Sequence, residues 1–492
     1  MVAEETAVHA PSGISGIETR SIDWVPENER HGKLWHQGPL WFLGNFQYFS
    51  IPIGFVGPAL GLSLWWSILA GAAGILTGTV FMAFHASQGP TLGLPQMIQS
   101  RAQFGYRGVV VALFATLFTY MAFNVADQVL MSEGLNGAFG WNADVVAVVT
   151  AIGAALLAIY GHDWVHRVFR VLLFFLLPLM AIITVGVITG HAGGGAGQAH
   201  LGFNWTGFMA QFSTAAAYNI TYAPYVSDYS RYLPKNTPRG PIIASVFAGA
   251  STPAIWLIAL GAWLAIRLQA TDGLVGLQTA GNNVLGHLGS VTAFLSATAL
   301  AATMGMNAYG GMLTTLTGID SFRTIHPNRR WRIITIVALA VLWYVVAKSI
   351  TTDAVGAVYG SLTLMLYLLV PWTATNLIDF FFVRRGHYAI THLFRLHNIY
   401  GVWAWRGLTA YAIGFLAEIP FMNIYNLFTF HTYYEGPFAK NINGVDIAWI
   451  VGLVVTSLVY IALTRNVDVR DEAPAIEESD RELAEGFDLA RR

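Results

Sequence analysis

The sequence of 492 residues contains no cysteine, and only 11% of its residues are charged. Without cysteine the chain can form no disulfide, no zinc–thiolate site and no thiol nucleophile. So few charged residues could not cover the surface of a soluble protein of this length, and 26 Lys+Arg against 27 Asp+Glu leave no basic excess for nucleic acid. Hydrophobic residues make up 55% instead. These features predict an all-α polytopic membrane protein.

We expect twelve membrane-spanning helices, because apolar stretches of about 18 to 25 residues recur along the chain. Each is long enough to cross a hydrocarbon core of roughly 30 Å. The polar segment that precedes them has the character of neither a signal peptide nor a transit peptide. The expected spans are 39–62, 64–87, 108–135, 143–160, 168–190, 206–227, 241–267, 290–317, 331–349, 353–382, 405–424 and 446–464.

The basic residues predict the orientation of these spans, since short cytoplasmic loops retain Lys and Arg. With both termini on the cytoplasmic side of the plasma membrane, only Arg267, Lys348 and Lys440 of the 26 basic residues fall elsewhere. An even number of spans with both ends cytoplasmic is therefore favoured. Small residues at helical spacing, such as Gly74 and Gly78, are expected to let helices pack closely.

Two spans contain breaks at matching positions. Gln47 precedes Pro52 by five residues in span 1, and Asn219 precedes Pro224 by five residues in span 6. A broken helix is tolerated in lipid only where protein or a water-filled cavity surrounds it. Because the two spans run in opposite directions, the pattern is typical of inverted-repeat transporters with broken helices beside the substrate. A proline inside a span is also a common kink with no role in binding, so position alone does not decide.

This pattern divides the chain into five parts. They are a cytoplasmic N-terminal segment (1–38), two five-helix repeats (39–190 and 206–382), a final helix pair (405–464) and a C-terminal tail (465–492). The tail is acidic, and we expect it to be partly helical and solvated.

Two further amides lie at corresponding depths, Asn124 in span 3 and Asn307 in span 8. An unpaired amide in hydrocarbon costs roughly 2 to 7 kcal/mol, so four such spans are expected to turn their amides toward one interior. For any single amide, an interhelical hydrogen bond is the alternative. Amides both donate and accept, and neighbouring aromatic side chains can stack on a ring. The interpretation is a site for a flat, neutral heteroaromatic ring such as a nucleobase.

Several stretches resemble one transporter family over about residues 20 to 465. The resemblance is to the nucleobase:cation symporters, the purine/cytosine permease and hydantoin transporter family. The stretches are WFLGNFQYFSIPIGFVGP (41–58), GLPQMIQSRAQFGYRG (93–108), SDYSRYLP (227–234), MNAYGGMLTTL (306–316) and DFFFVRRG (379–386).

The resemblance implies the leucine-transporter-like fold, with a five-plus-five inverted repeat of helices followed by two C-terminal helices. It also implies secondary active import driven by a proton or sodium gradient. Gln47, Asn124 and Asn307 would hydrogen-bond the base, and Tyr120 would stack on it.

The chain also departs from the family pattern. Asn219 stands where sodium-coupled hydantoin carriers have a tryptophan that stacks on the substrate, and Tyr218 or Tyr222 could replace that ring. Tyr222 and Asn45 both indicate the purine/cytosine branch.

Coupling to an ion is predicted from the same resemblance. In sodium-coupled relatives, span 1 carbonyls and two span 8 hydroxyls bind the ion, and the matching positions here are near Leu43 and Phe46 with Ala301 and Ala302. The alanines supply no hydroxyl oxygen, and a hard cation needs several oxygen ligands, so protons are favoured over sodium. A small register shift would restore a hydroxyl from Thr303 or Thr298.

A proton carrier needs an acid within the membrane. Asp127, one turn beyond Asn124, is the first candidate and Glu418 in span 11 the second. A structural carboxyl, or a wet one in an outer vestibule, is the alternative for Asp127.

These observations predict a proton-coupled importer of cytosine or a purine. A carrier of allantoin, hydantoin or uracil, with possible sodium coupling, is the alternative. The sequence has no HExxH, no GxSxG and no filter-like repeat, so an intramembrane enzyme or a channel is not favoured. We expect no cofactor, no nucleic acid and no obligate protein partner, only a small-molecule substrate and membrane lipid.

Overall fold

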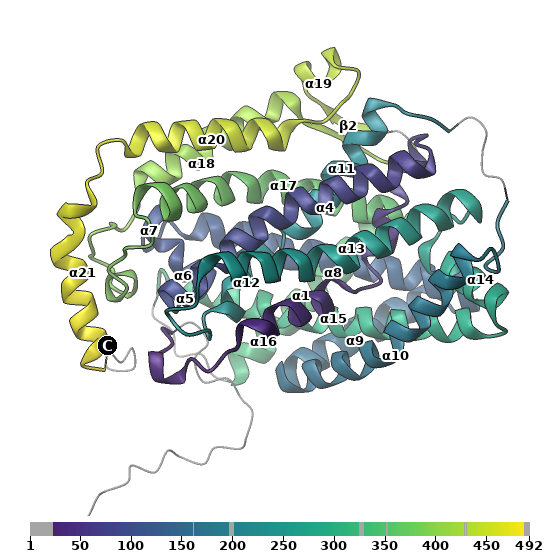
Figure 1. The fold of residues 1–492 in the computed structure, drawn as a ribbon, viewed down its shortest axis with the longest axis horizontal. Coiled ribbons are helices and arrows are strands. Elements are labelled where there is room, and N and C mark those ends of the chain that lie inside the picture. Colours follow the sequence, from purple (N-terminus) through teal and green to yellow (C-terminus); the bar gives the residue numbers. More distant parts are fainter. Residues whose placement is uncertain are drawn as a thin grey trace, which may run out of the picture.

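The computed structural model describes residues 23–160, 162–195, 201–323, 329–350, 353–427, 429 and 431–486. Most of the N-terminal segment (1–38) and the last six residues of the tail (465–492), both predicted from the sequence, therefore lie outside the described residues. The described chain is mostly helical, and its long helices run side by side along the longest axis of the molecule (Figure 1).

The first predicted repeat contains a broken first span, followed by helices that cross the molecule. Two short 3₁₀ turns, η1 (Glu27–Glu29) and η2 (Leu34–His36), precede it. Its helices are α1 (Gln37–Asn45), α2 (Ser50–Ile53), α3 (Val56–Ala59), α4 (Leu64–Ala86), α5 (Gln88–Leu92), α6 (Gln96–Gln99), α7 (Arg101–Phe104), α8 (Val110–Phe139), α9 (Ala143–Tyr160) and α10 (His162–Ile188).

The second predicted repeat again begins with a broken span. Its last long helix continues into a π-helical turn, η3 (Asp379–Val383). Its helices are α11 (Trp205–Ile220), α12 (Ala223–Ser230), α13 (Arg239–Arg267), α14 (Gly273–Val284), α15 (Leu288–Asp320), α16 (Arg329–Ile350) and α17 (Ala354–Ile378).

The remaining chain adds two long helices, a small hairpin and a terminal helix. The antiparallel strands β1 and β2 pair Asn423 with Glu435. The elements are η4 (Thr391–Phe394), α18 (Trp405–Glu418), η5 (Ile419–Phe421), β1 (Asn423–Tyr425), β2 (Thr432–Glu435), α19 (Pro437–Asn441), α20 (Ala448–Thr464) and α21 (Val469–Ala484).

Within the described residues, eight helices are long and apolar enough to cross a membrane, or nine if the bent pair α20–α21 is one span. They coincide with predicted spans 2, 3, 4, 5, 7, 8, 9 and 10. The other four predicted spans coincide with α1–α3, α11–α12, α18 and α20, which are broken or shorter. The structure is thus that of a multi-pass membrane protein and is consistent with twelve spans.

The break in the first span lies just before Pro52, where the sequence predicts it. The chain leaves helical geometry at Phe46, and helix resumes at Ser50. Pro52 has no N–H to donate to the carbonyl oxygen of Tyr48, so that oxygen accepts from Ile51 N instead, at 2.9 Å. In the second repeat, Pro224 stands in the first turn of α12, where no N–H is needed.

Close packing of small residues joins α4 to α11. A Cβ atom added to Gly74 would lie 2.2 Å from the carbonyl oxygen of Phe212, and one added to Gly78 would lie 2.1 Å from that of Ala216. Only glycine permits this approach of two backbones, as the spacing predicts.

Three features differ from the sequence-based expectation. Helix α14 and the hairpin were not predicted, because both are too short and too polar to give a span signal. Asp272 begins α14 by accepting hydrogen bonds from the N–H groups of Leu274 and Val275. The tail is helical in α21, as expected, but it is not solvated on all sides, because Ser479 is fully buried and Glu472 is bonded to Arg384.

Candidate functional site

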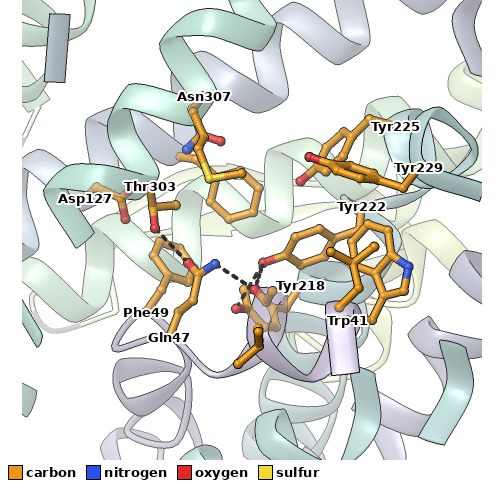
Figure 2. A pocket seen from close by; sticks show the side chains of 15 residues that line it. Trp41, Gln47, Phe49, Asp127, Tyr218, Tyr222, Tyr225, Tyr229, Thr303 and Asn307 are labelled. Atoms are coloured by element: carbon orange, nitrogen blue, oxygen red, sulfur yellow. Dashed lines mark hydrogen bonds between the residues drawn. The ribbon is translucent and has the colours of Figure 1, made fainter. Parts of the chain in front are cut away.

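A cavity of about 160 Å³ lies where both broken spans meet α8 and α15. It is the place that the sequence predicts for a substrate, beside both breaks. Figure 2 shows the side chains that surround it. The lining residues are Leu40, Trp41, Leu43, Gly44, Gln47, Phe49, Phe123, Asp127, Tyr218, Tyr222, Tyr225, Tyr229, Thr303, Met306 and Asn307.

Aromatic rings form much of the wall. Phe49, at the first break, stacks on Tyr218 of α11 with centroids 5.7 Å apart and an interplanar angle of 13°. Phe123 of α8 meets Phe49 edge-on at 5.1 Å, and Tyr222 meets Trp41 edge-on at 5.9 Å. Offset and edge-on contacts are the favoured geometries of aromatic pairs, so the wall is held in shape before any ligand arrives.

Gln47 connects the first break to α15. Its Nε2 donates to the carbonyl oxygen of Gly44 at 2.7 Å, and its Oε1 accepts from the hydroxyl of Thr303 at 3.2 Å. Figure 2 shows this amide between the break and Thr303. Residues from both predicted repeats thus fix the orientation of one amide that lines the cavity.

Asn124 and Asn307 form a second polar contact. Asn307 lines the cavity and donates from Nδ2 to Oδ1 of Asn124 at 3.1 Å. Asn124 in turn donates to the carbonyl oxygen of Met304 at 3.2 Å. Asn124 itself is not among the lining residues of the described cavity, so it can act on a ligand only through Asn307.

Asp127 is a carboxylate on the cavity wall. Its side chain is fully buried, and within the described residues neither carboxylate oxygen has a hydrogen-bond partner. A buried carboxyl without partners is costly when ionised. It can therefore accept from a ligand or hold a proton.

The structure places three predicted site residues elsewhere. Asn219 donates to the hydroxyl of Thr79 on α4 at 2.6 Å, and Asn45 donates back to the carbonyl oxygen of Trp41 at 3.3 Å. Tyr120 stacks on Tyr225 at 5.5 Å. None of the three lines the described cavity, so any role in binding would be indirect.

The helical phase explains the position of Asn219. Tyr218 and Tyr222 are four residues apart and point into the cavity together, whereas Asn219 is rotated by about 100° from Tyr218. Its side chain therefore points to the neighbouring helix α4.

The predicted coupling residues are divided between two spaces. Leu43 and Thr303 line the main cavity. Phe46 lines a space of about 10 Å³ that also touches Gln47, Thr303 and Ser296. Ala301 and Ala302 offer no side-chain oxygen, and no cluster of three or more His, Asp or Glu suited to a metal occurs in the described part of the chain.

Sequence reasoning missed several lining residues. Tyr225 and Tyr229 of α12 and Met306 of α15 line the cavity. The signal for the tyrosines was present in the sequence. Positions 218, 222, 225 and 229 recur at intervals of four and three residues, which is the spacing of one helix face.

The chain is similar to known permeases over most of its length. Residues 24–452 match the family described as permeases for cytosine/purines, uracil, thiamine and allantoin. The putative purine-cytosine permease YxlA of Bacillus subtilis is 33% identical over 454 residues, which cover 91% of this chain and 96% of the relative. The purine-cytosine permease FCY2 of Saccharomyces cerevisiae is 24% identical over 50% of this chain and 47% of its own length.

Two solved structures of Mhp1 have similar folds. One is in an inward-facing conformation, with a TM-score of 0.71, 16% identity and coverage of 95% of this chain and 97% of Mhp1. The other is described as a nucleobase-cation-symport-1 family transporter in a closed conformation with bromovinylhydantoin bound. Its TM-score is 0.71 and its identity 17%, and the match covers 96% of this chain and 100% of Mhp1. This likeness confirms the predicted leucine-transporter-like fold.

Proposed function

Because the chain belongs to the family of permeases for cytosine, purines, uracil, thiamine and allantoin, we propose that it imports cytosine or a purine by proton symport. The family consists of transporters and not enzymes, as the sequence predicts. The identity of the substrate and that of the coupling ion are the two points at which this proposal goes beyond membership of the family.

The observation that carries the proposal is the cavity itself. It lies beside both breaks and combines aromatic walls with the amides of Gln47 and Asn307. Its volume of about 160 Å³ compares with the roughly 150 Å³ of an engineered cavity that binds benzene, so it has room for a small aromatic ring. Asn and Gln match the mixed donor and acceptor edge of a nucleobase.

Each group has a proposed role in binding. Phe49, Tyr218 and Tyr222 supply faces or edges for the ring, and Asn307, oriented by Asn124, supplies a polar contact at its edge. Gln47 supplies a second polar contact at the edge of the base when its hydrogen bond with Thr303 is exchanged for one with the base. Asn45, Asn219 and Tyr120 support the wall from behind it.

For coupling, we place the proton on Asp127. The carboxylate has no competing partner in the described structure and lines the same cavity as the substrate amides. Protonation would remove the cost of a buried negative charge, so proton and substrate can be taken up together. Sodium coupling through the backbone near Leu43 and Phe46 with Thr303 is the alternative to be tested.

Transport would proceed by alternating access, in which two groups of helices rock against each other. The packing supports this division. Helix α4 packs against α11 and α13, whereas α8 packs against α15 and α9. The cavity lies between the two groups, because it takes lining residues from α11–α12 and from α8 and α15.

We further propose that the protein lies in the plasma membrane with both termini in the cytoplasm. The distribution of Lys and Arg supports this orientation. The face that carries α12 and α21 would then be cytoplasmic.

The experiment is uptake by purified protein in liposomes, with cytosine, adenine, uracil, allantoin and hydantoin offered separately. Proton and sodium gradients are imposed one at a time. We expect concentrative uptake of cytosine or a purine with a proton gradient alone. Uptake of hydantoin or allantoin that needs sodium would favour the alternative, and no uptake of any of them would refute the proposal.

A further inference from the structure

The C-terminal helix α21, hereafter the tail helix, lies across one end of the molecule. It is bent by 87° from α20, so it leaves the direction of the spans, and Figure 1 shows it in yellow beside the ends of the long helices. Arg395 pairs with Glu482 and, at 3.2 Å, with Glu478. The N–H of Thr391 donates to the hydroxyl of Ser479 at 3.0 Å. We call this end of the molecule the tail face.

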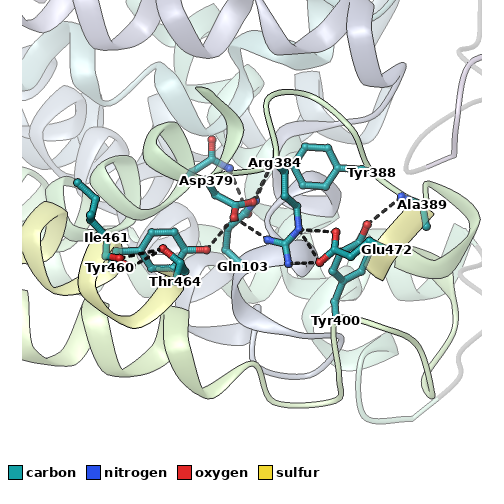
Figure 3. Close-up of polar contacts among 11 residues, drawn as sticks. Gln103, Asp379, Arg384, Tyr388, Ala389, Tyr400, Tyr460, Ile461, Thr464 and Glu472 are labelled. Carbon is teal, nitrogen blue, oxygen red and sulfur yellow. Dashed lines mark hydrogen bonds and ion pairs between the residues drawn. The ribbon is translucent and has the colours of Figure 1, made fainter. Parts of the chain in front are cut away.

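A second attachment joins the tail helix to the end of α17. Arg384 donates to both carboxylate oxygens of Glu472, each at 2.9 Å, and from Nη1 to Oδ1 of Asp379 at 2.6 Å (Figure 3). Two-pronged contacts of this kind are the stronger and more directional ion pairs. Burial lowers the pKa of Arg384, but the charges of Asp379 and Glu472 raise that pKa more, so the guanidinium stays charged.

Asp379 carries the contact into the protein. Its side chain is fully buried and accepts from Gln103 Nε2 at 2.6 Å, from the hydroxyl of Tyr388 at 2.7 Å and from that of Tyr460 at 2.9 Å. Figure 3 shows these groups converging on the carboxylate. A buried charge with several partners fixes their positions, because loss of any one leaves it undersatisfied.

From Gln103 the contacts continue to α12. Asn376 donates to Gln103 Oε1 at 3.3 Å, and Gln88 donates to Asn376 Oδ1 at 2.8 Å. Gln96 donates to Gln88 Oε1 at 2.9 Å, and the hydroxyl of Ser227 donates to Gln96 Oε1 at 2.6 Å. All five of these side chains are buried. The links also overlap, since Gln96 donates to Asn376 Oδ1 at 3.4 Å as well and Ser227 to the carbonyl oxygen of His85 at 2.8 Å.

Ser227 belongs to the helix segment beside the cavity. Helix α12 follows the second break and places Tyr225 and Tyr229 on the cavity wall. The helix is interrupted at Thr221 and Tyr222, so α12 is a separate helix from α11. A continuous series of contacts therefore connects the tail helix to α12, which lines the cavity and follows the break in the second repeat.

We propose that docking of the tail helix through Glu472 and Arg384 positions α12 and thereby limits access to the cavity from the tail face. Release of the tail helix loosens Asp379 and the amides behind it, and α12 moves more readily. This inference rests on the proposed function in one respect, that the cavity is the transport site. Arg384, Asp379, Gln103 and Gln96 are then positioning residues and do not touch the substrate.

Because the chain has no cysteine, a single cysteine can report access to the cavity without background. Met306→Cys places it on the cavity wall in the full-length chain. Its reaction rate with a membrane-impermeant maleimide is measured in vesicles of each orientation, so that each face is tested separately. In this background, Glu472→Gln breaks the charge pair with little change in shape, and Glu472→Asp retains the charge.

Glu477→Gln is the matched control, since it makes the same charge change at an exposed position of the same helix. We expect Glu472→Gln to raise the rate from the tail face by roughly three- to tenfold, with no change from the opposite face. Glu477→Gln should leave both rates unchanged, and Glu472→Asp should give an intermediate rate. Arg395→Gln, which releases the other attachment, should raise the tail-face rate if Glu472→Gln does not fold.

Equal tail-face rates in folded Glu472→Gln and Glu477→Gln would overturn the inference, as would equal increases from both faces. The labelling needs no substrate, so it is independent of the uptake experiment. If wild-type protein transports no base but Glu472→Gln changes labelling, the proposed function fails and the positioning of α12 stands. If bases are transported but Glu472→Gln leaves the labelling rate unchanged, the proposed function stands and the positioning of α12 by the tail helix fails.

Discussion

Asn307 donates a hydrogen bond to Asn124 at 3.1 Å, and only Asn307 of the two lines the cavity. The two amides come from α15 and α8, which belong to different predicted repeats. One residue is therefore placed to meet the substrate, and the other orients it.

This relationship predicts unequal and non-additive effects of substitution. Asn307→Ala should weaken binding of the transported base by about 1 to 3 kcal/mol, because a polar edge of the ligand loses its partner. Asn124→Ala should weaken it by less, and the double variant should resemble Asn307→Ala, since the residues are in contact. Binding measured by thermal stabilisation and KM for uptake test this, and independent, additive effects would contradict it.

The carboxylate of Asp127 has no hydrogen-bond partner in the described structure, so its replacement should affect proton coupling and not substrate binding. Asp127→Asn keeps the shape of the side chain and loses the titratable group, so proton-driven accumulation should fall by about tenfold or more. Exchange of labelled for unlabelled base across the membrane, which needs no net proton movement, should continue. Unchanged accumulation under a proton gradient would remove Asp127 from the coupling mechanism.

The close approach of α4 and α11 predicts an effect of substitution on stability. In Gly78→Val, the new side chain would meet the carbonyl oxygen of Ala216, since Cβ alone would lie 2.1 Å from it. We expect a loss of about 1 to 3 kcal/mol, seen as a lower melting temperature in detergent. Gly153→Val is the control, because a Cβ on Gly153 of α9 has nothing within 4 Å. Similar melting temperatures for both variants would contradict the packing argument.

Docking of the tail helix should depend on pH through Glu482. Burial raises the pKa of Glu482, but the nearby hydroxyl of Thr391, the hydrogen bond from Arg395 and the charges of Arg395 and His392 lower it more, and the net shift is downward. Because the docked state has the lower pKa, its contribution is present above the ordinary pKa of glutamate and is lost as pH falls through the lowered value. Hydrogen exchange of residues 469–484, followed from about pH 7 to about pH 3.5, should show release at the acid end. Glu482→Gln should weaken docking at neutral pH and remove this part of the dependence.

The sequence predicted the breaks more reliably than the directions of side chains. Hydropathy and proline spacing locate the breaks before Pro52 and Pro224, because both effects are local. The direction of Asn219 was missed, since one residue turns a helical side chain by about 100°, so that Tyr218 faces the cavity while Asn219 faces α4. Gln47 and Asn307 were expected on one cavity and line it together, while their action on a base stays a prediction.

Contacts between segments that are far apart in the chain could not be predicted from the sequence either. The charge of Glu472 gives no hint of Arg384, which lies 88 residues earlier in the chain. An acidic tail of this composition would be solvated if no basic partner came within reach. Helix α14 was not predicted, because twelve residues of mixed polarity have neither the hydropathy of a membrane span nor the composition of a loop.

The carbonyl oxygen of Gly44 accepts hydrogen bonds from Gln47 Nε2 and from the hydroxyl of Tyr222, at 2.7 Å and 3.1 Å. A carbonyl oxygen has two lone pairs, and both are occupied here. The carbonyl oxygen of Gly44, near the end of α1 beside the first break, is thus closed to a solute, and recognition at this point is left to replaceable side chains. New specificities can consequently arise in this architecture by a handful of point substitutions, with the polypeptide path kept unaltered.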